Sequence, residues 1–535
     1  MGEPALLGEL DKRWRSACKV VLKEDIGALS DFADYLSVPG GQLEASKSKL
    51  SGKDVYFASR EYCEGSGRLE FSESAFAQEK CKVGINDVKD MDSLLRAVSE
   101  RALYAGSVVL GNCSNVGESS NISDSHFVFA SSMSADSKYI AYCRQAKGCE
   151  SAFGCDAPGD SSFCIKCFDT YKAVRCFEVW CTSDSSDCYY SRNLSDCSEC
   201  LFSFHLKSKR YCIGNLALGK EKYLPLKEKL LSELREKLCK DKRLPSLVEI
   251  AGKCQNRHKE AYSEIKEAVQ GEAMGNDLQR MEDAFSSATG LVLGTRLSGM
   301  GNYRTWLTLH TGRFSEEKSA LSGKKVLRVD YGGHFLIPKE RLATHAECKA
   351  IGENIAISEA EAKSLALGNA HKALSKIAYF TTEHYVGTNV NVIDCPTMGY
   401  CANCYHCAPA VGAKECGYCF WPRHSDHCFG CDVVFHSSFC LKCYHSVKLS
   451  RCFEVDSSRD CADCYFCHNC ENVQSGIFCF NAKNLRYAVG NVEVGRVEFL
   501  RVKGMLLRRI VPALEEGRQP GLDIFNIACA GRKKA

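Results

Sequence analysis

The chain has no long hydrophobic run. No stretch of about 18 apolar residues occurs, so we expect no membrane-spanning helix. The first residues, MGEPALLGELDKRWRS, carry charges every few positions and therefore lack the apolar centre of a signal peptide. Position 6 is Leu6 and not serine or threonine, so the pattern for myristoylation is missing as well. These absences predict a cytoplasmic protein that makes no membrane contact and keeps its thiols reduced.

Proline and net charge are also low. Only 11 prolines occur in 535 residues, which argues against long disordered linkers. The net charge is +3, from 69 basic and 66 acidic residues, so no overall basic field favours nucleic acid. Phosphate-binding loops and nucleophile elbows are missing too. We therefore expect a non-enzymatic protein for which nucleic acid is an improbable partner.

Cysteine, in contrast, is abundant, with 35 residues, and it lies in a duplicated sequence. The segment SSFCIKCFDTYKAVRCFEV, from Ser161, is matched by SSFCLKCYHSVKLSRCFEV, from Ser437. Over 161–215 and 437–491 the match has no gap, and 24 of 55 positions are identical. Such a span indicates two tandem copies of one unit.

Each copy contains a shorter, twelve-residue repeat. In the second copy one column of cysteines is Cys404, Cys416, Cys428, Cys440, Cys452 and Cys464. A second column three residues later contains Cys407, Cys419, Cys431, Cys443, Val455, Cys467 and Cys479. Every third residue is small or apolar, which fits neither the helical period of about 3.6 residues nor the alternation of a flat strand. Four inward positions in each repeat predict one coil of a narrow solenoid, stacked at about 4.8 Å per coil.

The fold class predicted is therefore α+β with β-solenoid, in two tandem copies of an α/β cap and a cysteine-rich solenoid. KDVYFAS and KKVLRVDY favour strands in the caps, and Ser358 with Glu361 forms a capping box that opens a helix. The predicted domains are an N-terminal cap (1–112), the first solenoid (113–215), a helical bridge (216–289), a second cap (290–388), the second solenoid (389–491), and a C-terminal helix and tail (492–535).

The twelve-residue pattern with Cys, Ser and Ala inside is similar to that of the beetle antifreeze solenoid. The flat row of threonines that antifreeze activity needs is missing here, so the resemblance implies geometry alone. The array ending LKSKRYCIGNLALGKEKYLPL resembles cysteine-rich repeat proteins predicted in little-studied archaea and small-genome bacteria. That second resemblance implies no activity.

An apolar stripe follows the first cysteine column. Its members are Phe153, Ile165, Phe177, Tyr189 and Leu201 in the first copy, and Tyr405, Phe429, Leu441, Phe453 and Tyr465 in the second. If the cysteines point inward, this stripe points outward and needs a cover. The cover is either another part of the same chain or a partner, including a second copy in a dimer.

The segment CADCYFCHNC places Cys461, Cys464, Cys467 and Cys470 at all four inward positions of one coil. Four thiolates converging on one axis suit Zn²⁺ or iron. The bacterial ferredoxin pattern is not matched, because the last gap is two residues and Glu471 follows. The alternatives are that the cysteines fill a narrow core as small apolar residues, or that they form disulfides.

The leading functional interpretation is a structural scaffold or interaction protein that presents rigid solenoid faces. The main alternative is a zinc- or iron–sulfur-binding protein with its ligands in the second array. A weaker alternative is an enzyme with a site between the two copies.

Overall fold

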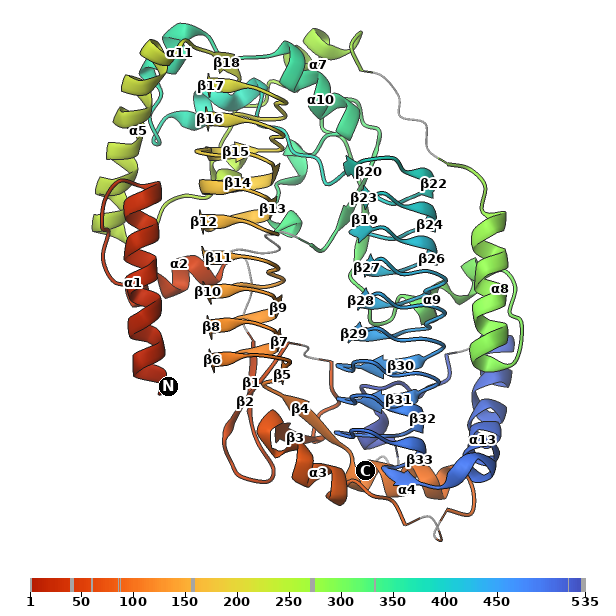
Figure 1. Ribbon diagram of the computed structural model, residues 1–535. Coiled ribbons are helices and arrows are strands. Elements are labelled where there is room, and N and C mark those ends of the chain that lie inside the picture. Colours follow the sequence, from red (N-terminus) through yellow and green to blue (C-terminus); the bar gives the residue numbers. More distant parts are fainter. Residues whose placement is uncertain are drawn as a thin grey trace. The chain divides into compact units, whose positions relative to one another are not determined.

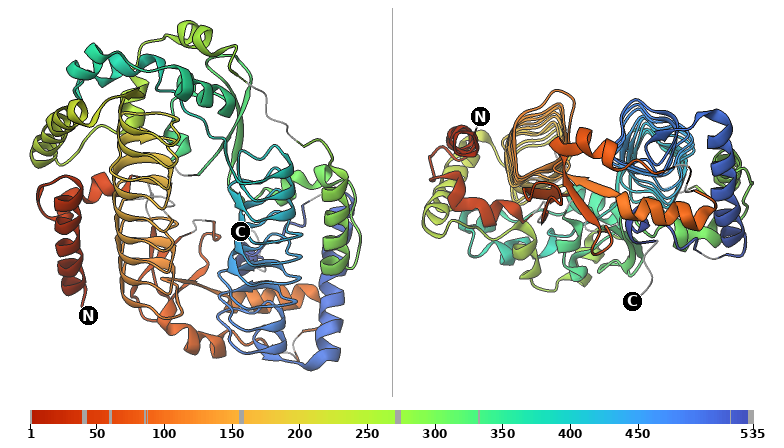
Figure 2. Two further views of the ribbon diagram at one scale, coloured as in Figure 1. Left: turned by 45° about the horizontal axis from the view of Figure 1, so that its top comes forward. Right: turned by 90° about the horizontal axis from the view of Figure 1, so that it is seen from below.

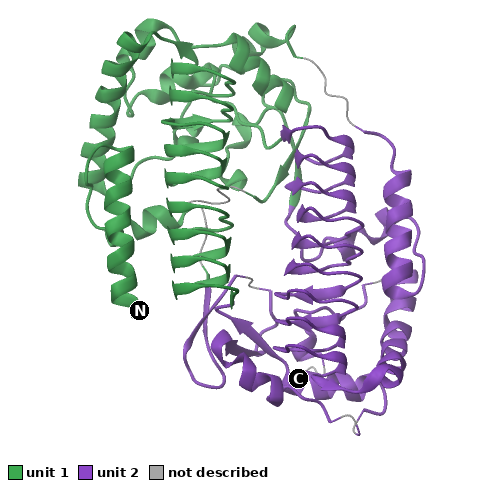
Figure 3. Ribbon diagram, viewed as in Figure 1, with its two compact units in different colours: residues 1–43, 109–272, 314–383 green, residues 44–108, 273–313, 384–535 purple. Residues whose placement is uncertain are grey.

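The computed structural model describes residues 2–38, 43–58, 61–84, 86, 88–154, 159–269, 275–331, 333–517 and 519–530 (Figure 1). The chain divides into two compact units (Figure 3). Unit 1 comprises Met1–Leu43, Val109–Glu272 and Phe314–Glu383, and unit 2 comprises Glu44–Val108, Ala273–Arg313 and His384–Ala535. Each unit thus combines one cysteine-rich array with the α/β segment that precedes the other array in sequence. The predicted cap 1–112 is consequently divided between the two units.

Unit 1 contains the first array, whose strands, nearly all parallel, form an 11-stranded sheet and a 3-stranded sheet. The strands are β5 (Val109–Leu110), β6 (Ser114–Gly117), β7 (Ser120–Ser123), β8 (His126–Phe129), β9 (Ser132–Ala135), β10 (Lys138–Ala141), β11 (Glu150–Phe153), β12 (Ser162–Ile165), β13 (Phe168–Tyr171), β14 (Val174–Ser183), β15 (Tyr189–Arg192), β16 (Ser198–Leu201), β17 (Arg210–Ile213) and the antiparallel β18 (Leu216–Ala217). Cys164 pairs with Cys176, and Cys200 pairs with Cys212. The register advances by one twelve-residue repeat in these pairs, whereas Val109, at the start of the array, pairs with Ile122, thirteen residues on. We call each repeat a rung.

Unit 2 contains the second array, which is built in the same way. Its strands are β21 (His384–Val386), β22 (Val390–Ile393), β23 (Thr397–Gly399), β24 (Ala402–Tyr405), β25 (Ala410–Val411), β26 (Lys414–Gly417), β27 (Phe420–Arg423), β28 (Asp432–Phe435), β29 (Tyr444–Val447), β30 (Phe453–Asp456), β31 (Tyr465–His468), β32 (Gln474–Ile477), β33 (Arg486–Val489) and the antiparallel β34 (Val492–Glu493). Cys404 pairs with Cys416, and Val455 pairs with Cys467. Seen along either array in Figure 2, the rungs lie over one another.

A left-handed backbone conformation recurs at every third residue of the rungs. Asp124, Phe127, Ala130, Met133 and Asp136, for example, have φ values of 46°, 57°, 45°, 51° and 52°. This conformation costs about 1–2 kcal/mol for most residues and less for Asn, Asp and Gly. The residue after each of these positions points into the array, which explains why the small or apolar residues recur every third position.

The inward serines and cysteines fill the core and also form hydrogen bonds with the backbone. The Oγ of Ser458 donates to the carbonyl of Asp456 at 2.8 Å and accepts the N–H of Cys470, one rung later, at 3.0 Å. The Sγ of Cys395 likewise donates to Ile393 at 3.2 Å and accepts the N–H of Cys407 at 3.3 Å. Serine and cysteine therefore alternate in these columns because both can donate within one rung and accept from the next.

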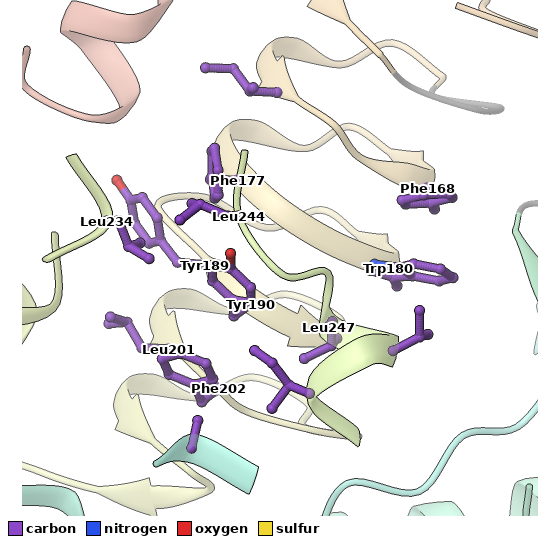
Figure 4. Close-up of a cluster of buried hydrophobic side chains, with 14 of the residues drawn as sticks. Phe168, Phe177, Trp180, Tyr189, Tyr190, Leu201, Phe202, Leu234, Leu244 and Leu247 are labelled. Carbon is purple, nitrogen blue, oxygen red and sulfur yellow. The ribbon is translucent and has the colours of Figure 1, made fainter. Parts of the chain in front are cut away.

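Helices of the same unit cover the apolar stripe of each array. In unit 1 these are α1 (Glu3–Val21), η1 (Leu29–Phe32), α2 (Ala33–Ser37), α5 (Lys220–Asp241) and α6 (Leu247–Gly252). The ring of Trp14 lies 5.4 Å from that of Phe153, and Tyr189 donates to the carbonyl of Val21 at 2.8 Å. Figure 4 shows Phe177, Tyr189 and Leu201 facing Leu234 and Leu244.

In unit 2 the stripe is covered by α8 (Gln279–Leu293), η4 (Met300–Tyr303), α9 (Arg304–Leu307) and α13 (Gly495–Glu515). Tyr465 donates to the carbonyl of Val292 at 2.9 Å, and the Trp306 ring lies 5.9 Å from that of Phe453. Nine of the ten stripe residues are buried, and Tyr405 is half-buried. The stripe is therefore internal to each unit, which agrees with the interpretation of a cover from the same chain and leaves no large surface there for a partner.

The remaining elements form the α/β segments. Unit 2 contains β1 (Glu44–Lys47), β2 (Asp54–Phe57), β3 (Gly67–Glu70), η2 (Phe71–Glu73), α3 (Ser74–Lys80), α4 (Met91–Arg101), β4 (Leu103–Gly106) and η8 (Ile527–Cys529). Unit 1 contains α7 (His258–Ile265), β19 (Phe314–Lys318), β20 (Lys325–Val329), η5 (His334–Leu336), η6 (Lys339–Arg341), α10 (His345–Asn354), α11 (Glu359–Ser364), α12 (Ala370–Ala373) and η7 (Leu374–Lys376). The predicted α+β class is thus confirmed.

Two details of the helix predictions can be compared with the structure. The capping box of Ser358 and Glu361 is present at the start of α11. The helix that it opens ends at Ser364, because Leu365 adopts an extended conformation with ψ of 132°. The last residues of the predicted tail, 531–535, lie outside the described residues.

Candidate functional site

The four cysteines of CADCYFCHNC lie in one rung of the second array, at and around β31. Cys461, Cys464, Cys467 and Cys470 are all at most 2% exposed. They belong to the buried cluster that fills the array. The structure therefore places all four predicted ligands inside the array, as the spacing of three residues requires.

Each of these thiols lies within hydrogen-bonding distance of the carbonyl two residues before it. The distances are 3.3 Å from Cys461 to Arg459, 3.3 Å from Cys464 to Ala462, 3.4 Å from Cys467 to Tyr465 and 3.5 Å from Cys470 to His468. Cys461, Cys464 and Cys470 also reach carbonyls of the following segment, at 3.4–3.5 Å. Because a carbonyl oxygen only accepts, a thiol at this distance from a carbonyl is a donor when it carries its proton.

The four thiols differ in pKa: burial acts to raise that of Cys467, but hydrogen bonds with Cys464, Cys470 and Cys479 lower it below its ordinary value, whereas burial favours the protonated form of Cys470 and Cys464. Burial raises the pKa of the Cys470 thiol, because a thiolate is poorly solvated there. Hydrogen bonds with Cys452, Cys461 and Cys467, followed by burial, raise the pKa of Cys464. A metal ion needs thiolates, so binding would have to release these protons and break the carbonyl contacts. Within the described ranges, no three or more His, Cys, Asp or Glu side chains are grouped to hold a metal ion.

The disulfide interpretation of the arrays finds no support among their described cysteines, all of which are free thiols. A disulfide does join Cys63 to Cys529 in unit 2, outside the array. Cys529 ends the segment Leu522–Cys529, which we call the C-terminal strap. Leu522, Ile524 and Phe525 of the strap are buried in unit 2.

The histidines of the second array lie in separate small groups, one of which has His445 and His468 on opposite oxygens of Asp456, at 3.7 and 2.8 Å. His424 and His436 stack at 5.3 Å, whereas His427 contacts Glu415 at 3.0 Å. His468 is buried: its Nδ1 donates to Asp456 at 2.8 Å, and its Nε2 accepts the N–H of Ala105 at 2.9 Å. This pair of contacts fixes the neutral tautomer of His468, whose ring thereby joins the array to β4.

A buried ion pair that sequence reasoning missed lies on the outside of the second array. Lys442 Nζ lies 2.8 Å from Glu454 Oε1, and the two side chains are 1% and 0% exposed. The other carboxylate oxygen of Glu454 accepts the N–H of Ile524, in the C-terminal strap, at 2.6 Å. Burial raises the pKa of Glu454, and the Lys442 ammonium opposes that rise. The pair therefore anchors the strap to the array.

Unit 1 contains the corresponding pair, one rung apart like the first. Lys166 Nζ lies 3.9 Å from Glu178 Oε2, with 4% and 0% of the side chains exposed. Glu178 Oε1 accepts the N–H of Leu247, the first residue of α6, at 2.9 Å. Burial lowers the pKa of Lys166 and raises that of Glu178. The Lys166 ammonium lies 3.8 Å from the centre of the Tyr35 ring.

A signal for these pairs was present in the sequence. Lysine at 166 and 442 and glutamate at 178 and 454 are among the identities between 161–215 and 437–491. The sequence alone does not show that they are buried, because charged residues at outward positions are usually solvated. Their burial depends on Tyr35, Trp306, α6 and the C-terminal strap, none of which is adjacent in sequence.

The sequence matches no protein-family model and no curated protein, and the structure matches no solved structure. Among the described residues, no helix has the length and apolar character needed to cross a bilayer.

Proposed function

We propose that this protein is a non-enzymatic scaffold, that its arrays are β-solenoids with one twelve-residue repeat per coil, and that the chain arose by internal duplication. The parallel registers, which advance by one repeat per strand in both arrays, support the solenoid interpretation. The gapless identity between 161–215 and 437–491 supports duplication. The buried lysine–glutamate pair at corresponding positions of both arrays supports it further.

One observation carries the scaffold proposal: the inward thiols are buried and act as hydrogen-bond donors to the backbone. Cys464, for example, is 0% exposed and lies 3.3 Å from the carbonyl of Ala462. Side chains used in this way hold the rungs in register and have no access to a substrate. A partner protein would therefore be bound by the outward-facing residues of the arrays.

The first array exposes a regular column of carboxylates. Asp124, Asp136, Asp160, Asp184 and Asp196 are exposed and recur at every rung or every second rung. Gly148 and the exposed Lys172 occupy the two intervening rungs of this column. Neighbouring rungs are about 4.8 Å apart, so the carboxylates form a ladder at multiples of that spacing. Aspartate is also tolerated in the left-handed conformation that these positions adopt. A rigid ladder of negative charge fits a basic segment of a partner protein.

The test compares binding of a lysine-rich peptide to the full chain and to two charge-matched variants. The first variant replaces three ladder residues, as Asp136→Asn, Asp160→Asn and Asp184→Asn. The control replaces three exposed acidic residues elsewhere in unit 1, as Glu221→Gln, Glu236→Gln and Glu267→Gln. We expect salt-sensitive binding that the ladder variant loses and the control keeps. Equal loss in both variants, or no binding to the unmodified chain, would reject the ladder as the recognition surface.

The second candidate function is metal binding by Cys461, Cys464, Cys467 and Cys470. It is favoured by their occupation of all four inward positions of one rung. Zn²⁺ or an iron–sulfur cluster would be held by their thiolates after the protons are released.

A further inference from the structure

Unit 1 contains a cavity of about 680 Å³ beside the buried Lys166. Its apolar walls include Val38, Phe168, Val248 and Leu336. Its rim carries charges that are mainly paired with each other, such as Arg243 with Glu249 at 2.8 Å. The cavity is therefore large enough for a small organic molecule, with a mostly apolar interior and a charged entrance.

Three polar groups meet at the inner end of the cavity. Lys166 and Tyr35 both line it, and Glu178 lies behind them. Neither the hydroxyl of Tyr35 nor the Oε2 of Glu178 has a hydrogen-bond partner in the described part of the chain. Tyr35 is 6% exposed and Glu178 is 0% exposed. Buried polar atoms in this state are costly, so their convergence beside a cavity points to a polar group of a ligand.

The matching pair in unit 2 is arranged differently. There the charged atoms lie 2.8 Å apart, whereas those of the pair in unit 1 are separated by 3.9 Å. Glu454 Oε1, like Glu178 Oε2, makes no hydrogen bond of good geometry in the described part of the chain. Trp306 occupies the place over Lys442 that Tyr35 occupies over Lys166. The same two charged residues are thus a closed ion pair in unit 2 and a more open pair facing a cavity in unit 1.

We propose that Lys166 is a carbonyl-reactive lysine, which forms a Schiff base with small uncharged aldehydes or ketones that have an apolar body. The walls of the cavity would take the apolar body. The Nζ of Lys166 would attack the carbonyl carbon, while the Tyr35 hydroxyl donates a hydrogen bond to the carbonyl oxygen. This site is independent of the scaffold role proposed above.

The chemistry balances without an oxidant or a further reactant. Addition of the amine to the carbonyl gives a carbinolamine, and loss of one water molecule gives the protonated imine. Glu178 can return a proton to the departing hydroxyl, since its carboxyl lies 3.9 Å from Nζ. Attack requires the neutral amine, and the lowered pKa of the buried Lys166 increases its share.

The charges at the entrance of the cavity are the reason why we propose uncharged carbonyl compounds. Asp31, Asp34 and Asp241 line the entrance, so an anionic carbonyl compound would meet repulsion there. Lys242 is paired with Asp31 at 3.7 Å, which reduces its value as an anion-binding group.

The test uses benzaldehyde with sodium cyanoborohydride on the full chain, followed by peptide mass mapping of the reduced adducts. We expect saturable labelling of Lys166 that exceeds labelling of Lys442 and of each exposed lysine. Lys166→Arg should abolish the main adduct, Glu178→Gln should slow its formation, and Lys442→Arg should leave it unchanged. In the unmodified chain, benzyl alcohol should protect Lys166, because it fills the same cavity but cannot form an imine.

Labelling that follows lysine exposure, with no preference for Lys166, would overturn the proposal. Preferential labelling of Lys166 that benzyl alcohol does not reduce would overturn the role of the cavity. Because the protection experiment needs no variant, the proposal can be rejected even if Lys166→Arg does not fold.

Discussion

Replacing Lys442 with methionine removes the cation of a buried ion pair and leaves the Glu454 carboxylate without its partner. Both side chains are at most 1% exposed and the charged atoms are 2.8 Å apart. Methionine retains much of the volume of lysine, so the loss is mainly electrostatic. We expect Lys442→Met to destabilise unit 2 and to loosen the C-terminal strap, whose Ile524 donates to Glu454.

The size of the effect is limited by protonation of Glu454. Breaking a buried pair costs about 3–5 kcal/mol. Taking up a proton at about pH 7 costs a carboxyl of ordinary pKa near 4.3 about 3.7 kcal/mol, from about 1.36 kcal/mol per pH unit. At about pH 5 the same step costs about 1 kcal/mol. Because burial raises the folded pKa of Glu454, the missing stability should return as the pH falls toward its unfolded pKa.

The assay is urea unfolding at several pH values, combined with hydrogen exchange of the peptide that contains Ile524. The control is the double variant Lys442→Met with Glu454→Gln, which removes both charges and keeps a side-chain acceptor for the Ile524 N–H. We expect the double variant to recover much of the loss at about pH 7. A destabilisation that does not change with pH, or a double variant as unstable as the single one, would refute the role assigned to this pair.

Three further predictions concern single positions. Cys440→Asp should cost several kcal/mol in urea unfolding, because a charge enters a dry core, whereas Cys440→Ala should cost about 1–2 kcal/mol; equal costs would show that Cys440 is not enclosed. Ser458→Ala should cost about 1–3 kcal/mol, because the N–H of Cys470 loses its acceptor, and Ser458→Cys should restore most of it; no rescue by cysteine would contradict the shared role of the two residue types. Cys529→Ser should speed hydrogen exchange in the C-terminal strap, because the Cys63–Cys529 disulfide holds the strap to unit 2, and exchange in the first array should stay unchanged. Unchanged exchange of the strap would show that the disulfide is dispensable there.

The twelve-residue register could be predicted from sequence because one extra residue would shift every later column. Cysteine columns such as Cys404, Cys416 and Cys428 therefore identify strand partners directly, and the pairing of Cys404 with Cys416 confirms that register. The burial of Cys461, Cys464, Cys467 and Cys470 followed from the same spacing.

Two other features depend on interactions that a single repeat does not reveal. The sequence does not show that Ser458 and similar residues accept hydrogen bonds from backbone N–H groups of the next rung. That role depends on which N–H groups lack a strand partner, and the left-handed conformation at every third position determines which groups those are. The sequence does not predict which α/β segment packs with which array, because either of the two similar α/β segments could cover the apolar face of an array.

The burial of Lys166 and Glu178 illustrates the same limit at the level of a site. Their outward positions predicted solvent contact, but Tyr35 and α6 cover them from distant parts of the sequence. Sequence identity between 161–215 and 437–491 marks both residues without showing that they form a pair.

Metal analysis of the full chain, purified without chelators and paired with a count of reactive thiols in the native protein, tests the scaffold proposal most directly. If the thiols of the arrays are protonated structural donors, the protein should carry no stoichiometric metal. Its array thiols should react only on unfolding, and Cys464→Ser should fold normally, because a serine hydroxyl can donate to the carbonyl of Ala462. About one zinc ion or one iron–sulfur cluster per chain, lost in Cys464→Ser, would contradict the scaffold proposal and assign Cys461, Cys464, Cys467 and Cys470 as metal ligands.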